Sequence, residues 1–220
     1  MKPDYWLQRW QEGRIGFHRA EANPRLVEHH RVLGDAIRVL VPLCGKSADL
    51  EWLVVHGFEV VGIELSELAA KAFFTERGFT PERREQGSFV AYSHGHVSIL
   101  VGDFLAASSA ELGHFDGAYD RAAMIALPLE LRARYAAHLQ TLLAPKAKLL
   151  LVTLCYDAEG GPPFSVAPDE VRAAYAEARV TQLAHVDAKA ETPGPVERGA
   201  SFVYEDVYEV AFGVAPKSAN

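Results

Sequence analysis

The alternation of apolar and polar positions predicts a strand, a loop, a helix and a second strand between residues 37 and 66. An apolar, β-branched run opens this stretch and is interrupted at residues 42–47. Apolar residues then recur at helical spacing as far as Gly57, and a second apolar run ends at Glu64. A strand–helix–strand unit of this size forms a right-handed parallel crossover, and ligands bind outside the carboxyl ends of such strands. We therefore expect the 42–47 loop and Glu64 to share one crevice.

The same pattern predicts further helices and strands along the chain. Helices are expected over residues 4–12, 23–33, 65–78, 128–143 and 168–178, and strands over residues 88–93, 96–101, 114–120, 148–156, 180–186 and 201–210. The last two strands come without a helix between them, which favours an antiparallel pair at the sheet edge. The strands at 88–93 and 96–101 are predicted to form a hairpin inserted into the alternating pattern. The predicted fold class is therefore α/β, a doubly wound, mostly parallel, seven-stranded sheet with an antiparallel C-terminal strand.

The N-terminal segment is predicted to be a helical cap or lid. We expect one domain over residues 1–220, with residues 1–34 forming this cap. Trp6 and Trp10 lie one helical turn apart in the first predicted helix, so they share a face. Two interpretations fit this pair: both rings pack against the core, or Trp10 forms a wall of the ligand site.

Composition and charge narrow the range of partners. The chain has 220 residues, of which 49% are hydrophobic, which is enough for one sizeable core. The formal net charge of −7, with basic residues scattered along the chain, argues against nucleic acid as a partner. Cys44 and Cys155 give no disulfide framework, and the sequence has neither an N-terminal apolar block nor an apolar run of about 18 residues. We expect a soluble, cytoplasmic, monomeric protein with no membrane partner.

The glycine of the 42–47 loop does not belong to a phosphate-binding motif. A P-loop needs a glycine five positions before Gly45, where this chain has Leu40, and a dinucleotide fingerprint needs three glycines across the turn. A nucleoside-binding crevice remains, because Glu64 follows Gly45 by 19 residues at the end of a predicted strand. A carboxylate there accepts hydrogen bonds from ribose hydroxyls.

A second carboxylate, Asp103, also follows a predicted strand. It is a candidate acceptor for an adenine amino group, or else a cap for the helical turn that begins at Phe104. The nine histidines show no metal-binding spacing such as HExxH, and the sequence has no G-x-S-x-G elbow. We therefore expect neither a metal site nor a covalent nucleophile.

Five stretches of the sequence form a specific set. They are residues 6–18 (WLQRWQEGRIGFH), 41–50 (VPLCGKSADL), 60–67 (VVGIELSE), 119–121 (YDR) and 156–164, which ends in Gly-Pro-Pro-Phe. Together they resemble the thiopurine S-methyltransferase family of class I S-adenosylmethionine-dependent methyltransferases, over nearly the whole chain. The resemblance implies a Rossmann-like methyltransferase fold, S-adenosylmethionine as cofactor, S-adenosylhomocysteine as product, no metal, and a small-molecule thiol as substrate.

The resemblance also implies roles for individual residues. The cofactor-binding set is Trp10, Leu43, Gly45, Glu64, Gly102, Asp103 and Arg121, and the substrate-binding set is Phe17, Arg121, Pro163 and Phe164. Some relatives carry an arginine before a Trp-Gly pair that orients the thiopurine ring. Residues 194–199 read GPVERG here, so the tryptophan is missing and Arg198 is out of register. The geometry of the acceptor on that side is left open.

The reaction of this family indicates one catalytic residue. Methyl transfer to a thiolate depends on alignment and a dry site more than on acid–base groups. A cation is enough to hold a thiolate, and Arg121, directly after a predicted strand, is the candidate. The alternative is a structural ion pair with Asp120 or Asp103. Two other functions stay open: methyl transfer to halide, bisulfide, or selenium and tellurium species, and nucleoside binding without catalysis.

Overall fold

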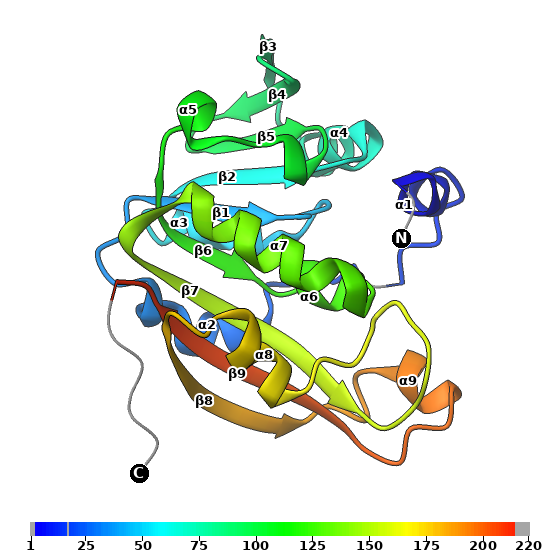
Figure 1. Ribbon diagram of the computed structural model, residues 1–220. Coiled ribbons are helices and arrows are strands. Elements are labelled where there is room, and N and C mark those ends of the chain that lie inside the picture. Colours follow the sequence, from blue (N-terminus) through cyan, green and yellow to red (C-terminus); the bar gives the residue numbers. More distant parts are fainter. Residues whose placement is uncertain (1–2, 17, 214–220) are drawn as a thin grey trace.

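The computed structural model describes residues 3–16 and 18–213. In this part of the chain nine strands form one sheet, in the order β3-β4-β5-β2-β1-β6-β7-β9-β8 (Figure 1). The strands are β1 (Arg38–Pro42), β2 (Glu59–Glu64), β3 (Glu82–Gln86), β4 (Phe89–His94), β5 (Val97–Val101), β6 (Phe115–Asp120), β7 (Leu143–Tyr156), β8 (Arg179–Asp187) and β9 (Val203–Ala211).

Helices cover both faces of this sheet (Figure 1). The α-helices are α1 (Pro3–Gln11), α2 (Pro24–His29), α3 (Ala48–Val55), α4 (Glu67–Glu76), α5 (Ser109–Leu112), α6 (Ala123–Ala126), α7 (Leu129–Leu142), α8 (Pro168–Ala174) and α9 (Pro193–Glu197), and two 3-10 turns are η1 (His30–Leu33) and η2 (Phe104–Ala106). One core cluster contains α7 and α8 residues, and the other contains residues of α2, α3 and α4. This two-sided packing confirms the doubly wound α/β architecture.

The centre of the sheet is parallel. Strand β1 pairs in parallel with β2 and β6, β2 pairs with β5, and β6 pairs with β7. Strand β9 lies between β7 and β8 and is antiparallel to both. The prediction of a mostly parallel sheet with an antiparallel C-terminal strand is therefore confirmed.

The predicted count of seven strands is wrong for the described residues, where the sheet has nine: β4, which corresponds to the predicted strand at 88–93, and β3, which the sequence does not predict, extend the sheet beyond β5 as antiparallel strands. Strand β3 reads ERREQ and has no buried residue, so it lacks the alternation that marks a strand. A charged edge strand of this kind discourages pairing with other chains. The short helix α9 also lies between β8 and β9, where the sequence predicts no helix.

Local capping explains where the helices next to the central strands begin. Asn23 accepts a hydrogen bond from the backbone of Arg25 and precedes Pro24 at the start of α2. Ser47 caps α3, and Ser66 caps α4. Helix α1 contacts α4, which places it beside the carboxyl ends of the parallel strands (Figure 1). None of the described helices combines the length and apolar character needed to cross a bilayer.

Candidate active site

The 42–47 loop and Glu64 meet at the carboxyl ends of β1 and β2. Glu64 Oε2 accepts a hydrogen bond from the backbone N–H of Gly45 at 2.9 Å, and Oε1 accepts one from Ser66 at 2.8 Å. The two strands are parallel neighbours, so the loop after one is brought onto the last residue of the other. The expected proximity of the loop and Glu64 is confirmed by this contact, and the ligand crevice between them stays a prediction.

Glu64 is a buried carboxylate with acceptor capacity left. Its exposed fraction is 6%, and burial raises its pKa, while the hydrogen bonds from Ser66 and Gly45 act in the opposite direction. A carboxylate offers about four lone-pair sites, and the hydrogen bonds from Gly45 and Ser66, with the nearby backbone of Leu65, leave acceptor capacity unused. The binding of ligand hydroxyls to this capacity stays a prediction.

The backbone of the loop is shaped to pass under Trp10. Leu43 and Gly45 both adopt positive φ angles, of 50° and 55°. A Cβ atom on Gly45 would lie 3.1 Å from the Trp10 ring, so the absence of a side chain allows the indole to pack closely on the loop. Trp10 is 7% exposed. The ring is therefore buried, as the first interpretation predicts, and because it packs on the loop next to Glu64, its role as a wall of the ligand site stays a prediction.

The end of β5 adds two of the predicted residues. The backbone N–H of Gly102 donates to the carbonyl of Glu64 at 2.9 Å, which fixes this segment beside β2. A Cβ on Gly102 would lie 2.6 Å from the Phe89 ring, so packing requires a glycine here. Asp103 accepts a hydrogen bond from Leu105 N at 2.9 Å and caps η2. The capping interpretation is confirmed, and the contact with an adenine amino group stays a prediction.

Arg121 follows β6 directly, and its ionic partner is Asp49. The Nε atom of Arg121 lies 3.5 Å from Asp49 Oδ2. The alternative prediction, a structural ion pair with Asp120 or Asp103, is wrong about the partner, since the described ion pair of Arg121 is with Asp49. Asp120 instead accepts hydrogen bonds from the backbone N–H groups of Ala123 and Met124, and Asp103 caps η2.

Asp49 is a residue of this site that the sequence does not reveal. It is 2% exposed, and its Oδ1 accepts a hydrogen bond from Asn23 N at 2.7 Å. Its Oδ2 accepts a hydrogen bond from Tyr119 Oη at 3.1 Å. In the sequence, Asp49 lies in the first turn of a helix, where an acidic residue is ordinary, so no local signal separates it from a helix-stabilising carboxylate.

The Arg121 guanidinium keeps its positive charge although little of the side chain is exposed to solvent. Burial is the largest single influence and lowers its pKa, but Asp49, Tyr119 and Glu205 together outweigh it, so the net shift of the Arg121 pKa is upward. Its Nε is buried without a hydrogen bond to any described residue, because the approach of Asp49 is ionic and long. A cation that stays charged at every working pH therefore lies at the carboxyl end of β6.

His18 is a second residue of this region that the sequence pattern does not single out. Burial lowers its pKa, and the positive charges of Lys46, Arg77 and Arg121 act in the same direction, while Glu76 opposes them. Its imidazole is therefore neutral near pH 7. Lys46 itself is held by Glu76 of α4.

Of the predicted substrate-binding residues other than Arg121, the structure describes Pro163 and Phe164 but not Phe17. Pro163 and Phe164 lie in the loop after β7, where the backbone N–H of Phe164 donates to the carbonyl of Ile125 at 2.7 Å. This bond joins the loop to α6, which begins two residues after Arg121. Phe17 lies outside the described residues.

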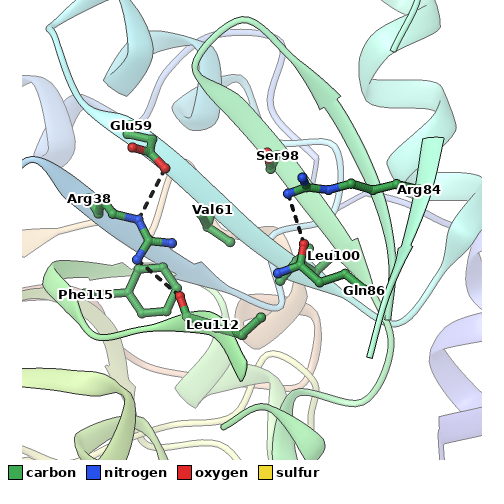
Figure 2. Close-up of a pocket in the computed structure, with 9 residues that line it drawn as sticks. All are labelled: Arg38, Glu59, Val61, Arg84, Gln86, Ser98, Leu100, Leu112 and Phe115. Atoms are coloured by element: carbon green, nitrogen blue, oxygen red, sulfur yellow. Dashed lines mark hydrogen bonds and ion pairs between the residues drawn. The ribbon is translucent and has the colours of Figure 1, made fainter. Parts of the chain in front are cut away.

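A separate cavity of about 60 Å³ lies near the amino ends of β1 and β2 (Figure 2). Arg38 Nε lies 3.2 Å from Glu59 Oε1, and its guanidinium also donates to the carbonyl of Leu112 at 3.2 Å. Across the cavity, Arg84 donates to Gln86 Oε1 at 3.1 Å (Figure 2). These groups already have partners, and the cavity is at the other end of the sheet from Glu64. Among the described residues no group of three or more His, Cys, Asp or Glu side chains is arranged to hold a metal.

Comparisons with known proteins identify the family and the fold of the chain. The sequence model of one family, described as thiopurine S-methyltransferase, matches residues 1–211. A thiopurine S-methyltransferase of Pseudomonas putida is 45% identical over 215 residues, which cover 96% of this chain and 100% of that relative. One of Azotobacter vinelandii is 46% identical over 215 residues, covering 96% and 99%. A solved 1,6-didemethyltoxoflavin-N1-methyltransferase of Burkholderia thailandensis has a TM-score of 0.66 at 16% identity, covering 96% of this chain and 87% of its own, which supports the fold.

Proposed function

Since this chain belongs to the thiopurine S-methyltransferase family, we propose that it transfers a methyl group from S-adenosylmethionine to the sulfur of an aromatic or heterocyclic thiol such as a thiopurine. The coarser activity, S-adenosylmethionine-dependent methyl transfer, follows from the family and agrees with the fold of the solved neighbours. The thiol acceptor and the roles of single residues are the content of the proposal.

The residues around Glu64 fit the cofactor. A buried carboxylate with unused acceptor sites at the end of β2 suits the two hydroxyls of a ribose. Leu43 and Gly45 form the loop beside it, Trp10 packs on that loop, and Gly102 and Asp103 lie one strand further along the same edge. We assign these residues to the cofactor. When bound, S-adenosylmethionine supplies an electrophilic methyl group on a sulfonium sulfur.

One observation carries the acceptor proposal: a permanently charged Arg121, whose side chain is only 16% exposed, lies two strands away from Glu64 at the same end of the parallel strands. Neighbouring strands are about 4.8 Å apart, so the two side chains start roughly 10 Å from each other. This spacing leaves room for a nucleophile between the cofactor crevice and the guanidinium. Pro163 and Phe164 belong to the loop that reaches α6 beside it, and we assign them to the acceptor together with Phe17.

Arg121 acts by holding an anion. An aromatic thiol ionises near neutral pH and releases its proton to solvent, so a strong base is not needed. The guanidinium then stabilises the thiolate and orients its lone pair. The new bond forms between the thiolate sulfur and the methyl carbon while the bond from that carbon to the sulfonium sulfur breaks. Alignment of this kind supplies on the order of 7–11 kcal/mol of a reaction barrier.

The test is a transfer assay with a panel of acceptors. Purified protein is incubated with methyl-labelled S-adenosylmethionine and, separately, 6-mercaptopurine, thiophenol, iodide, bisulfide and selenite. We expect labelled methyl thioethers from the two aryl thiols. Methylation of iodide, bisulfide or selenite alone would replace the proposed acceptor with a small soft nucleophile. Cofactor binding with no methylated product from any acceptor would contradict an enzymatic role.

A further inference from the structure

Arg198 contacts the loop that carries the proposed acceptor-binding residues. Its Nη2 atom donates to Tyr156 Oη at 3.0 Å and to the carbonyl of Pro163 at 3.0 Å. The guanidinium carbon lies 5.6 Å from the centre of the Tyr156 ring. Tyr156 is the last residue of β7, and Pro163 is near the far end of the loop that follows, so one side chain links both ends of the loop.

Tyr156 also holds this loop together through hydrogen bonds of its hydroxyl. Its hydroxyl lies 2.6 Å from the carbonyl of Pro163 and 3.0 Å from the carbonyl of Gly160. The hydroxyl has one proton, so it accepts from Arg198 while it donates to one of these carbonyls. Tyr156 is itself 5% exposed and therefore a fixed anchor. The position of the Pro163 carbonyl is thus set by an anchored phenol and an arginine together.

The other side of the loop is held by different elements. Phe164 is joined to Ile125 of α6 through its backbone N–H. Arg132 of α7 is 4% exposed and donates to the carbonyl of Ser165 at 2.9 Å. These two bonds hold Phe164 and Ser165, whereas Arg198, which follows α9, contacts the preceding Pro163 and Tyr156 at the start of the loop.

We propose that Arg198 is a positioning residue that sets where Pro163 and Phe164 lie and thereby controls the binding of the methyl acceptor, an inference that rests on the proposed function. Both of its described contacts through Nη2 are to protein oxygens, which distinguishes it from a group that touches the substrate. The fork of a guanidinium reaches two acceptors at once, which a lysine ammonium on a flexible stem does less well.

A positioning role for Arg198 predicts that its loss affects acceptor binding and not cofactor binding. Glu64 and the 42–47 loop are held by their own bonds at β1 and β2, and no described contact joins them to Arg198. Loss of Arg198 should therefore displace the acceptor side of the site and leave the cofactor side in place.

The experiment compares R198A and R198K with the wild-type protein. For each, kcat and KM are measured with 6-mercaptopurine and with the smaller thiophenol, and the Kd of S-adenosylmethionine is measured by calorimetry. With the thiopurine as acceptor, we expect R198A to raise KM about tenfold or more and R198K to raise it less, since R198A loses both charge-assisted hydrogen bonds and R198K keeps the charge. The cofactor Kd should stay within about twofold, because Arg198 does not contact the cofactor side. Hydrogen exchange should accelerate at residues 157–165.

The matched control is R172A, which removes an exposed arginine paired with Asp169 of α8. It should leave both KM values unchanged. If the wild-type protein methylates the thiols and R198A has an unchanged KM, the inference about Arg198 is overturned and the proposed function stands. The same holds if R198A loses acceptor and cofactor binding equally and has a lowered melting temperature. A wild-type protein that methylates no thiol would overturn the proposed function and this inference with it.

Discussion

The carboxylate of Asp49 lies 3.5 Å from the Nε of Arg121, and the same side chain accepts a hydrogen bond from the backbone of Asn23 at 2.7 Å. One buried acid therefore joins the cap of α2 to the cation at the end of β6. Leaving either charge without the other inside the protein is costly, because a buried unpaired charge loses its hydration. The position of Arg121 thus depends on how the N-terminal part of the chain is packed.

Replacing Arg121 should lower turnover more than cofactor binding. We expect R121A to reduce kcat/KM for 6-mercaptopurine about 10- to 100-fold, which corresponds to about 1.5–3 kcal/mol for a lost charged interaction. R121K keeps the positive charge but loses the planar pair of N–H donors of a guanidinium, so its kcat/KM should lie between those of R121A and the wild-type protein. Steady-state kinetics and calorimetry with S-adenosylmethionine give the two quantities. Unchanged turnover in R121A would remove Arg121 from the mechanism.

Neutralising Asp49 should act through Arg121. In D49N the amide oxygen can still accept from Asn23, but the charge facing Arg121 is lost and the guanidinium becomes free to move. We expect kcat/KM to fall about tenfold and the free energy of unfolding to fall by about 1–3 kcal/mol. The control is D169N, which neutralises an exposed acid paired with Arg172. If D49N and R121A combined were fully additive in kcat/KM, the two residues would act independently, contrary to this account.

Glu64 should govern cofactor affinity. E64Q preserves the shape of the side chain but replaces one acceptor oxygen with a donor, so we expect the Kd of S-adenosylmethionine to rise about 10- to 100-fold, or about 1–3 kcal/mol. The matched control is E59Q, at the amino end of the same strand, where Glu59 pairs with Arg38. Equal cofactor affinity in E64Q and the wild-type protein by calorimetry would refute the assignment.

The pH dependence of cofactor binding provides a separate check on Glu64. Burial raises the pKa of this carboxyl above its ordinary value, so it takes up a proton earlier than an exposed glutamate as the pH falls. The protonated acid is a weaker acceptor, and we expect the affinity for S-adenosylmethionine to decrease on acidification in the wild-type protein. In E64Q this decrease should be absent. Parallel pH profiles for the two proteins would exclude Glu64 as the titrating group.

The sequence predicts the parts of this site that depend on neighbouring strands and local caps. Glu64 follows an apolar run and Ser66 caps the next helix, so their positions follow from the pattern alone. The role of Asp49 could not be predicted, because its partners are brought together by the fold: Asn23 is 26 residues away and Tyr119 is 70 residues away. Strand β3 escapes prediction for a different reason, since an exposed edge strand buries no apolar face.

Asp120 should make the stability of the protein depend on pH. Burial raises its pKa to about 6 from an ordinary 3.8, although hydrogen bonds from Tyr135, Met124 and Ala123 oppose this shift. The native state therefore binds more protons than the unfolded state between these values, so stability falls by up to about 3 kcal/mol as the pH rises from about 4 to about 6. In D120N the amide oxygen can still accept from the backbone of α6, and its NH2 can donate to Tyr135 Oη. Urea unfolding from pH 4 to 7 should show D120N gaining stability relative to the wild-type protein as the pH rises. A constant difference would mean that Asp120 is already ionised throughout this range.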